Sequence, residues 1–390
     1  MARSRVLSII DLTDQEIEAW RALAARAAEP NPYFEPEMLV PAVRELSGGS
    51  ELRLLVVDDP GGTAPGEVEP GGADPGGAES GGWWAALPFE MVPGDTHWPW
   101  RHASTGSDFL ALYCPLGTPL VDGARVDEAV EALVDAFHLR RRELGQAIDL
   151  HLLSRDGRVG QRLGEVCEER GVPVHTWGGD PRGAVRFDEG DPGSWAERMP
   201  RGKSLARGRR RLERAVGETL VLEDRGDDPE IAKAFLDFEQ QGWKGDASRG
   251  GLGFRSRRGG QEWFTQMLAG FAETGRAHVF ALVAGGVLLH MAVIVCTGST
   301  AFGYFDVYSE EWARYGPGAI GRMMALSWLD ENSDVEVFDS SMNPSLYKDA
   351  TDLFPDRLTM VSSTVVTGGV VARLTMRLMR AAARVVRRFR

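Results

Sequence analysis

The sequence predicts an α/β (α+β) protein built from two domains, each with a sheet flanked by helices. The chain has 390 residues, of which 43% are hydrophobic, and at about 100–200 residues per domain this length fits two domains with buried cores. Short apolar runs typical of strands alternate along the chain with stretches of helical periodicity. We expect a first domain over residues 1–185, a second over 186–367 and a separate tail over 368–390.

The first domain begins with a strand and then a helix whose start is marked by a capping box. In this box Thr13 accepts a hydrogen bond from the amide of Glu16, and the Glu16 side chain reaches back to the amide of Thr13. The periodicity then predicts helices over 36–46, 126–143 and 157–170, and strands over 3–10, 51–57, 83–89, 147–153 and 172–177.

Residues 58–82 differ in composition from the rest of the first domain. They contain nine glycines, four prolines and six acidic residues, with no basic residue. Such a stretch buries too little apolar surface to offset its ordering entropy. Because a strand resumes at Trp83, we interpret the stretch as a disordered loop that expands a hairpin, rather than as a linker between domains. The entropy of loop closure grows only logarithmically with length, so a long loop is tolerated here.

The second domain opens with a basic helix and contains the most apolar stretch of the chain. That stretch, residues 277–296, is about as long as a bilayer span. It is interrupted by Gly285-Gly286, so two buried strands joined by a glycine turn explain it better than a membrane helix. The remaining pattern predicts helices over 203–217, 229–241, 261–274 and 318–330, and strands over 219–223, 301–307, 335–340 and 358–366.

The charge is distributed unevenly. The chain has a net charge of −13, which argues against a nucleic-acid-binding protein as a whole. Two segments are basic: residues 201–214 carry seven basic residues and one acid, and residues 368–390 carry seven arginines and no acid. For the first we favour a solvated helix paired with acidic residues elsewhere over a helix that attracts phosphates. The tail is predicted to be a basic amphipathic helix. Peripheral contact of this helix with an anionic membrane and its packing on the acidic chain are equally good interpretations.

The cysteines and the N-terminus indicate a cellular compartment. Cys114, Cys167 and Cys296 lie far apart without histidine at ligand spacing, which argues against a disulfide framework or a zinc site and fits a reducing cytosol. The first apolar run ends at Asp11, too early for a signal peptide. We therefore expect a cytoplasmic protein without a metal, peripheral at the inner membrane surface if the tail binds lipid.

The strongest local motif is a strand that ends in a glycine turn and a helix. Tyr304-Phe-Asp306-Val-Tyr308 reads as the end of the strand, and Gly316-Pro-Gly318 precedes the helix. Glycines let backbone amides approach an anion, and the helix N-terminus adds partial positive charge. Such a turn suits a pyrophosphate, although an ordinary strand-to-helix turn has the same pattern.

Several motifs in this order resemble the GNAT N-acyltransferase superfamily, and in particular its branch of CelD-like cellulose-biosynthesis proteins. The motifs are Trp20, Asn31-Pro-Tyr-Phe34, Glu239-Gln-Gln-Gly-Trp243-Lys244-Gly245, Tyr315-Gly-Pro-Gly318, Asp339 and Tyr347-Lys348. The resemblance covers the chain up to about residue 367. It implies two tandem GNAT-like domains similar to those of Fem-type transferases, each with a mixed, mostly antiparallel sheet flanked by helices.

The resemblance also implies a set of site residues. The acyl-CoA donor is expected at the glycine turn, on Arg314, Gly316, Gly318, Ala319 and Ile320. A candidate base removes the proton of the attacking amine. We favour Asp306, which lies closest to this turn, and keep Glu239 as the second catalytic candidate; Asp339 and His290 are alternatives, His290 being more typical of a core histidine. The residues expected around the acceptor are Trp243, Lys244, Asp339, Tyr347 and Lys348.

The function expected from this resemblance is acyl-CoA-dependent transfer of an acyl group, such as acetyl, to an amine. The acceptor would be a small molecule or a saccharide, and neither a metal nor a nucleic acid is required. Two alternatives remain: a Fem-type ligase that takes its acyl group from aminoacyl-tRNA, and a non-catalytic accessory factor in polysaccharide assembly.

Overall fold

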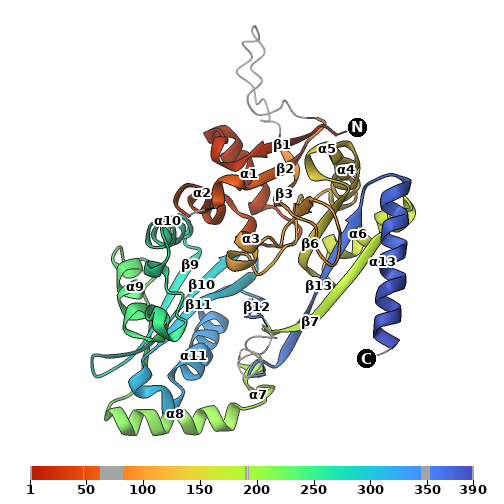
Figure 1. Cartoon of the computed structure of the whole chain (residues 1–390). Coiled ribbons are helices and arrows are strands. Elements are labelled where there is room, and N and C mark those ends of the chain that lie inside the picture. The colour runs from red at the N-terminus through yellow and green to blue at the C-terminus, as the bar shows by residue number, and fades with distance from the viewer. Residues whose placement is uncertain are drawn as a thin grey trace. The chain divides into compact units, whose positions relative to one another are not determined.

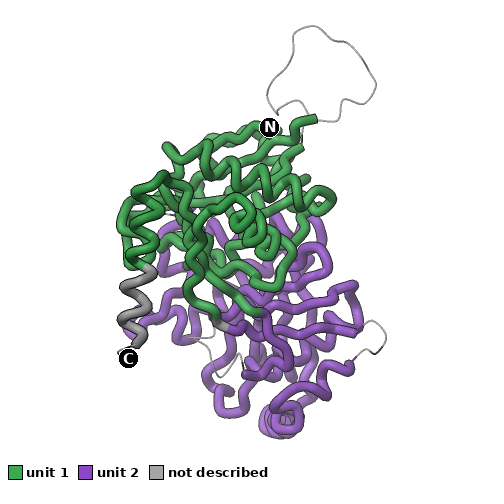
Figure 2. Tube along the Cα trace, turned by 90° about the vertical axis from the view of Figure 1, so that its right-hand side faces the viewer, with its two compact units in different colours: residues 1–43, 48–180, 359–390 green, residues 44–47, 181–358 purple. Residues whose placement is uncertain are grey.

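A computed structural model of the chain describes residues 2–46, 48–61, 82–188, 191, 193–343 and 352–388. The chain forms two compact units (Figure 2). Unit 1 comprises residues 1–43, 48–180 and 359–390, and unit 2 comprises residues 44–47 and 181–358. Most of the loop predicted over 58–82 lies outside the described residues, so its disorder stays a prediction.

The sheet of unit 1 is mixed and mostly antiparallel. Its strands follow the order β1-β2-β3-β4-β6-β13-β7, with β5 paired to β3 beside this path. Neighbours from β1 to β4 are antiparallel, β4 and β6 are parallel, and β6 and β13 are antiparallel. The strands are β1 (Ser4–Ser8), β2 (Arg53–Asp58), β3 (Trp83–Val92), β4 (His102–Ser104), β5 (Leu120–Val121), β6 (Ala147–Ser154), β7 (Val174–Arg186) and β13 (Asp356–Val366).

The helices of unit 1 begin with the one that the capping box predicts. Glu16 N donates to Thr13 Oγ1 at 3.3 Å, and Thr13 N donates to Glu16 Oε2 at 3.1 Å, so both halves of the box are present. Apolar residues at helical spacing, including Trp20 and Leu23, are fully buried. The helices are α1 (Asp14–Ala25), α2 (Pro36–Glu45), α3 (Asp108–Tyr113), α4 (Val126–Leu139), α5 (Arg141–Leu144) and α6 (Arg158–Glu169).

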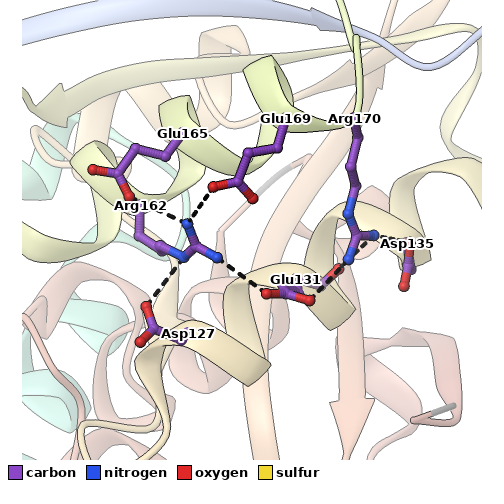
Figure 3. Close-up of polar contacts among 7 residues, drawn as sticks. All are labelled: Asp127, Glu131, Asp135, Arg162, Glu165, Glu169 and Arg170. Carbon is purple, nitrogen blue, oxygen red and sulfur yellow. Dashed lines mark hydrogen bonds and ion pairs between the residues drawn. The ribbon is translucent and has the colours of Figure 1, made fainter.

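Ion pairs join the outer surfaces of α4 and α6 (Figure 3). Arg162 of α6 contacts Asp127 and Glu131 of α4 at 3.1 and 3.0 Å. It also contacts Glu165 and Glu169 of its own helix. Arg170, just after α6, contacts Glu131 and Asp135. Most of these carboxylates are exposed, so each ion pair contributes little to the free energy of unfolding. The network joins the two helices to each other without adding much stability to the unit.

The sheet of unit 2 is built on the predicted apolar hairpin. Its order is β8-β9-β10-β11-β12 followed by the end of β7. The hairpin β9–β10 turns at Gly285-Gly286, as predicted. β8 to β11 are antiparallel, β11 and β12 are parallel, and β12 and β7 are antiparallel. The strands are β8 (Val221–Asp224), β9 (Ala277–Ala284), β10 (Val287–Thr297), β11 (Thr300–Tyr308) and β12 (Val337–Asp339).

Helices cover both faces of this sheet (Figure 1). Phe305 of β11 packs with Phe264 of α10 at a ring distance of 6.3 Å, whereas the next residue, Asp306, contacts Arg322 of α11. Because successive side chains of a strand point to opposite faces, α10 and α11 lie on opposite sides. The helices are α7 (Ser194–Glu197), α8 (Gly202–Val216), α9 (Ile231–Gln241), α10 (Gly260–Ala272) and α11 (Pro317–Asn332).

The two units share one strand pattern, which confirms the predicted tandem architecture. In each unit, antiparallel neighbours lead to one parallel pair, β4 with β6 and β11 with β12. One prediction needs correction. The strand expected over 358–366 was assigned to the second domain, but β13 pairs with β6 of unit 1, and Val366 lies opposite Ala147. Alternation along a strand predicts that it has a buried face, but not which distant strand it joins.

The basic tail is helical, as predicted, and it belongs to unit 1. Ala372 and Met376 of α13 (Val370–Arg388) are buried in one cluster with Trp98, Ala147 and Val366. Leu374 and Leu378 of the same helix are exposed. Among the described residues, no helix is long and apolar enough to span a membrane.

Candidate functional site

Strands β11 and β12 run parallel but pair only over three residues. Phe302 lies opposite Asp339, and there β12 ends while β11 continues to Tyr308. Beyond the end of β12, a cavity of about 210 Å³ lies within unit 2. Its lining comprises Lys244, Ala292, Val293, Ile294, Gly303, Tyr304, Phe305, Asp306, Arg322, Ala325, Phe338, Ser340, Ser341, Met342 and Phe354.

A β-bulge in β11 lies at the wall of this cavity. Val293 of β10 is opposite Phe305, whereas the next residue, Ile294, is opposite Gly303, so Tyr304 is an extra residue on β11. A bulge bends a strand and changes the direction of its side chains and backbone groups, which is why bulges are frequent beside active sites. The bulged residue Tyr304 and the serines that follow the end of β12 both line the cavity.

Charged side chains meet at the carboxylate of Asp306. Arg322 of α11 approaches Asp306 Oδ2 to 2.5 Å, and His290 Nε2 of β10 lies 3.3 Å from the same oxygen. Lys244 Nζ donates to the backbone carbonyl of Asp306 at 2.5 Å. Asp306 is the only carboxylate among the described lining residues.

The surroundings of Asp306 determine which protonation states are present. Burial alone would raise the pKa of Asp306, but the charge of Arg322 and the hydrogen bond with His290 outweigh it and hold this pKa well below its usual range. Burial lowers the pKa of His290 more than Asp306 raises it. At neutral pH the pair is therefore a carboxylate beside a neutral imidazole.

The glycine turn forms an uncapped helix N-terminus. Gly316 has a φ of 71°, a left-handed conformation that favours glycine, and Pro317 begins α11. No side chain caps the helix, so the first-turn amides of Gly318 and Ala319 are its orphan donors. A Cβ on Gly318 would point toward Tyr308 and His290, and a Cβ on Gly316 would point into open space. The geometry fits an anion at these amides.

The basic helix α8 lies beside this turn. The guanidinium carbons of Arg211 and Arg314 lie 5.9 and 4.8 Å from the centre of the Tyr315 ring. Within the described part of the chain, the only ion pair made by a basic residue of α8 joins Arg209 to Glu213 of the same helix. The helix is mostly exposed to solvent, as the preferred prediction has it, but among the described residues its basic side chains form no ion pair with acidic residues of other elements.

The other predicted site residues have varied environments. Lys244 lines the cavity, whereas Trp243 is 37% exposed and its amide donates to Glu310. The Glu239 carboxylate accepts a hydrogen bond from Phe254 N at 2.8 Å, and burial raises its pKa. It lies outside the cavity lining, so its contacts fit a role in ordering the segment after Lys244.

Two further predicted residues have structural contacts, and two others lie outside the described residues. Asp339 forms a buried ion pair with Arg182 at 3.1 Å and accepts from the amide of Ser341. The Ile320 side chain packs in a core cluster with Leu212. Tyr347 and Lys348 are not among the described residues, so their role stays a prediction.

Sequence reasoning missed Arg322, the serines after β12 and the bulge of β11. Arg322 is one turn after Gly318 on the helix that follows the glycine turn, and its position was the available signal: a lone arginine on a helix rich in small and apolar residues. Ser340 and Ser341 line the cavity and directly follow Asp339, the one residue of this segment that the sequence predicted as part of the site. A bulge has no periodic signature because it interrupts the alternation by which strands are recognised.

One group of potential metal ligands lies in unit 1, and its chemistry favours an ion pair. The ligand atoms of Asp95, His102 and Asp149 lie within 4.8 Å of one another. His102 Nδ1 is 2.8 Å from the Trp100 carbonyl, and Nε2 is 3.0 Å from Asp149. Burial lowers the pKa of His102, but Asp149 outweighs it and raises the pKa. Both ring nitrogens of His102 thus face oxygen atoms of the protein, an arrangement that suits an ion pair with Asp149 better than a metal ligand.

Comparisons with known proteins agree with this geometry. The acetyltransferase (GNAT) domain family matches residues 201–349, which lie in unit 2. No curated protein sequence matches the chain.

Three solved structures resemble the chain over nearly its whole length. A crystal structure of FemX is 12% identical, with a TM-score of 0.54 over 94% of this chain and 98% of that one. A conserved protein of unknown function from Bacteroides thetaiotaomicron is 10% identical, with a TM-score of 0.54 over 94% and 100% of the two chains. The C-terminal domain of an Agrobacterium fabrum protein assigned as a lysylphosphatidylglycerol synthetase is 13% identical, with a TM-score of 0.51 over 94% and 95%. At these identities the likeness establishes the fold. Residues 201–349 thus match the acetyltransferase (GNAT) domain family, and the chain has a FemX-like fold over 94% of its length.

Proposed function

We propose that the protein transfers an acyl group from an acyl-CoA thioester to an amine of a small molecule or a saccharide, in the cavity between β11 and β12. The observation that carries this proposal is the arrangement along β11. One strand supplies the bulged wall of the cavity and leads through the glycine turn into the uncapped N-terminus of α11. A ligand with an anionic part and a reactive acyl end matches both features.

The donor would be held by two kinds of contact. The amides of Gly318 and Ala319 would bind the pyrophosphate, with the cationic side chains of Arg314 and Arg211 nearby. The cavity is lined largely by aromatic and aliphatic side chains, which suits the less polar acyl end. In this proposal Ile320 contributes through its place in the helix, since its side chain is buried in the core.

The reaction requires little of the protein beyond positioning the thioester and the amine. The amine nitrogen attacks the thioester carbonyl, a C–N bond forms, the C–S bond breaks, and the CoA thiolate leaves and takes up a proton. The Asp306 carboxylate, which lines the cavity, would bind the incoming amine as its ammonium ion. A carboxylate with a lowered pKa holds a cation well but accepts a proton poorly, so the proton that the amine loses before attack goes to water.

Calorimetry with donor ligands tests the proposal. We expect acetyl-CoA, a longer acyl-CoA and free CoA to release heat on binding. Ala319→Asp adds a negative charge to the first turn of α11, which favours the helix dipole but repels the pyrophosphate. Ala319→Asn has the same shape without the charge and is the matched control. The aspartate variant should bind the donor about tenfold more weakly than the asparagine variant, a difference of ~1.4 kcal/mol.

One observation favours a second candidate, a Fem-type ligase that uses aminoacyl-tRNA. The arginines of α8 lack acidic partners on other described elements, and Arg211 lies beside the glycine turn, where a phosphate backbone would meet it. In that case acyl-CoA would release no heat in calorimetry, and tRNA would bind. The double variant Arg207→Gln, Arg211→Gln would then weaken tRNA binding more than Arg210→Gln does. If neither acyl-CoA nor tRNA binds, both enzymatic proposals fail and a non-catalytic accessory role takes their place.

A further inference from the structure

The first half of α13 exposes an unusual concentration of apolar side chains. Val370, Val371, Leu374 and Leu378 are 74, 67, 50 and 72% exposed. These four, within nine residues, account for a third of the exposed large apolar residues recorded along the described chain. Scattered exposed apolar residues need no explanation, but a contiguous patch marks a surface that binds something.

Helical geometry separates this patch from the face by which α13 is anchored. Ala372 and Met376, four residues apart, are buried against unit 1. Leu374 and Leu378, also four residues apart, lie on the opposite side of the helix together with Val371. Figure 1 shows α13 as a straight rod at the edge of unit 1. Over residues 370–379, whose side chains the structure describes, the anchored face and the exposed apolar face thus lie on opposite sides of the helix.

Arginines run along the flank between these two faces. Arg373 and Arg377 are exposed, and no ion pair joins either to another described residue. The sequence continues the pattern, because residues 368–390 contain seven arginines and no acidic residue, in a chain whose net charge is −13. A partner for this helix must accept aliphatic side chains and neutralise positive charge at the same time.

We propose that α13 binds the surface of a membrane rich in anionic lipids, with its axis in the plane of the interface. Valine and leucine side chains would enter the boundary between headgroups and acyl chains, and the flanking arginines would meet lipid phosphates. A second copy of the chain fits less well, because pairing two such helices would bring arginines together without any acid to neutralise them. The acidic remainder of the protein opposes binding only weakly, since charges are screened beyond a Debye length of ~8 Å.

Vesicle co-sedimentation of the full chain tests this surface. We expect the protein to sediment with vesicles made of equal parts phosphatidylglycerol and phosphatidylcholine, and not with phosphatidylcholine alone. Raising the salt concentration should weaken binding, as it does for any interaction with a charged surface. The double variant Leu374→Gln, Leu378→Gln should bind the anionic vesicles about tenfold more weakly, because it removes apolar surface and no charge.

A matched control separates the helix from general surface hydrophobicity. Leu139, at the end of α4, is 59% exposed, and Leu139→Gln should leave vesicle binding unchanged. All variants must melt within a few degrees of the wild type, so that a loss of binding cannot come from unfolding.

Several results would overturn the proposal. One is the absence of wild-type binding to anionic vesicles; another is equal binding by the double variant. A third is that the wild type does not bind vesicles but forms concentration-dependent dimers in analytical ultracentrifugation, and that the double variant does not form them. This result would assign the surface to contact with a second copy of the chain. None of these outcomes depends on whether acyl-CoA binds in unit 2.

Discussion

Asp306 shows how one carboxylate can be central to a site and still be a weak base. Burial acts to raise its pKa, yet Arg322 at 2.5 Å and the hydrogen bond with His290 lower it further than burial raises it. A group whose pKa is lowered in the folded state stabilises the fold above its unfolded pKa of about 3.9, and loses that effect only as the pH falls through the folded value. The ion pair is therefore present at any working pH of the protein.

This assignment predicts the kinetics of Asp306→Asn. The variant should raise KM for the amine acceptor about tenfold, or ~1.4 kcal/mol, because the ammonium loses its charged partner. Donor affinity, measured by calorimetry, should change less than twofold. The pH profile of kcat/KM for the wild type should follow the ionisation of the acceptor amine, without a limb from this carboxylate between pH 5 and pH 9.

A control and a contrary result complete this test. Asp334 is exposed and lies just after α11, so Asp334→Asn removes an equal charge from unit 2 and should leave both parameters unchanged. If Asp306→Asn instead abolishes kcat while KM stays constant, and an acidic limb disappears from the profile, Asp306 is the general base and the binding role is wrong.

At the scale of elements, α11 matters because of how closely it approaches the sheet. A Cβ on Gly321 would lie 2.2 Å from Nδ1 of His290, whose imidazole is fully buried. Gly321→Ala should therefore destabilise the protein by about 1–3 kcal/mol, the usual cost of overpacking. Urea denaturation followed by circular dichroism measures this loss.

The matched control for Gly321 is a helical glycine with free space around it. A Cβ on Gly164 of α6 would meet nothing within 4 Å. Gly164→Ala should stabilise the protein by about 0.4–1 kcal/mol, because alanine has less conformational entropy to lose in a helix. Opposite signs for the two substitutions are expected; equal signs would mean that α11 moves away from β10 at little cost.

Most elements were predictable because their signals are local. The capping box of Thr13 and Glu16, the glycine turn of the β9–β10 hairpin and the periodicity of α11 each lie within a few neighbouring residues. The contacts within the site were harder to predict from the sequence. The contact between Asp306 and Arg322 depends on how α11 crosses the sheet, and the burial of Asp339 depends on Arg182, which is distant in sequence. No local pattern encodes either contact.

At the scale of the whole molecule, the pairing of β13 sets the limit of sequence reasoning. Its β-branched and apolar residues are typical of a strand. Its partner β6, however, lies about two hundred residues earlier in the chain, as Thr364 and Asp149 show by their side-chain hydrogen bond. The entropy of loop closure grows only slowly with the number of residues between two strands, so pairing with a distant strand costs little more than pairing with a near one. The packing of the whole fold therefore decides which strand β13 joins. The same reasoning predicts that the long insertion between β2 and β3 is dispensable.

The ends of that insertion are already in position for a tight hairpin. Asp58 of β2 lies opposite Trp83 of β3, and Asp59 N donates to the Gly82 carbonyl at 2.9 Å. Replacing residues 60–81 with Asn-Gly, the residues that favour a two-residue hairpin turn, should therefore keep the melting temperature within a few degrees. A glycine-serine segment of the same length as the original should give a similar value, because in this account the insertion contributes only closure entropy. Differential scanning calorimetry of the three forms measures the difference. If the short form fails to fold while the glycine-serine form melts normally, the turn is strained; if both lose stability, residues 60–81 make contacts that their composition does not predict.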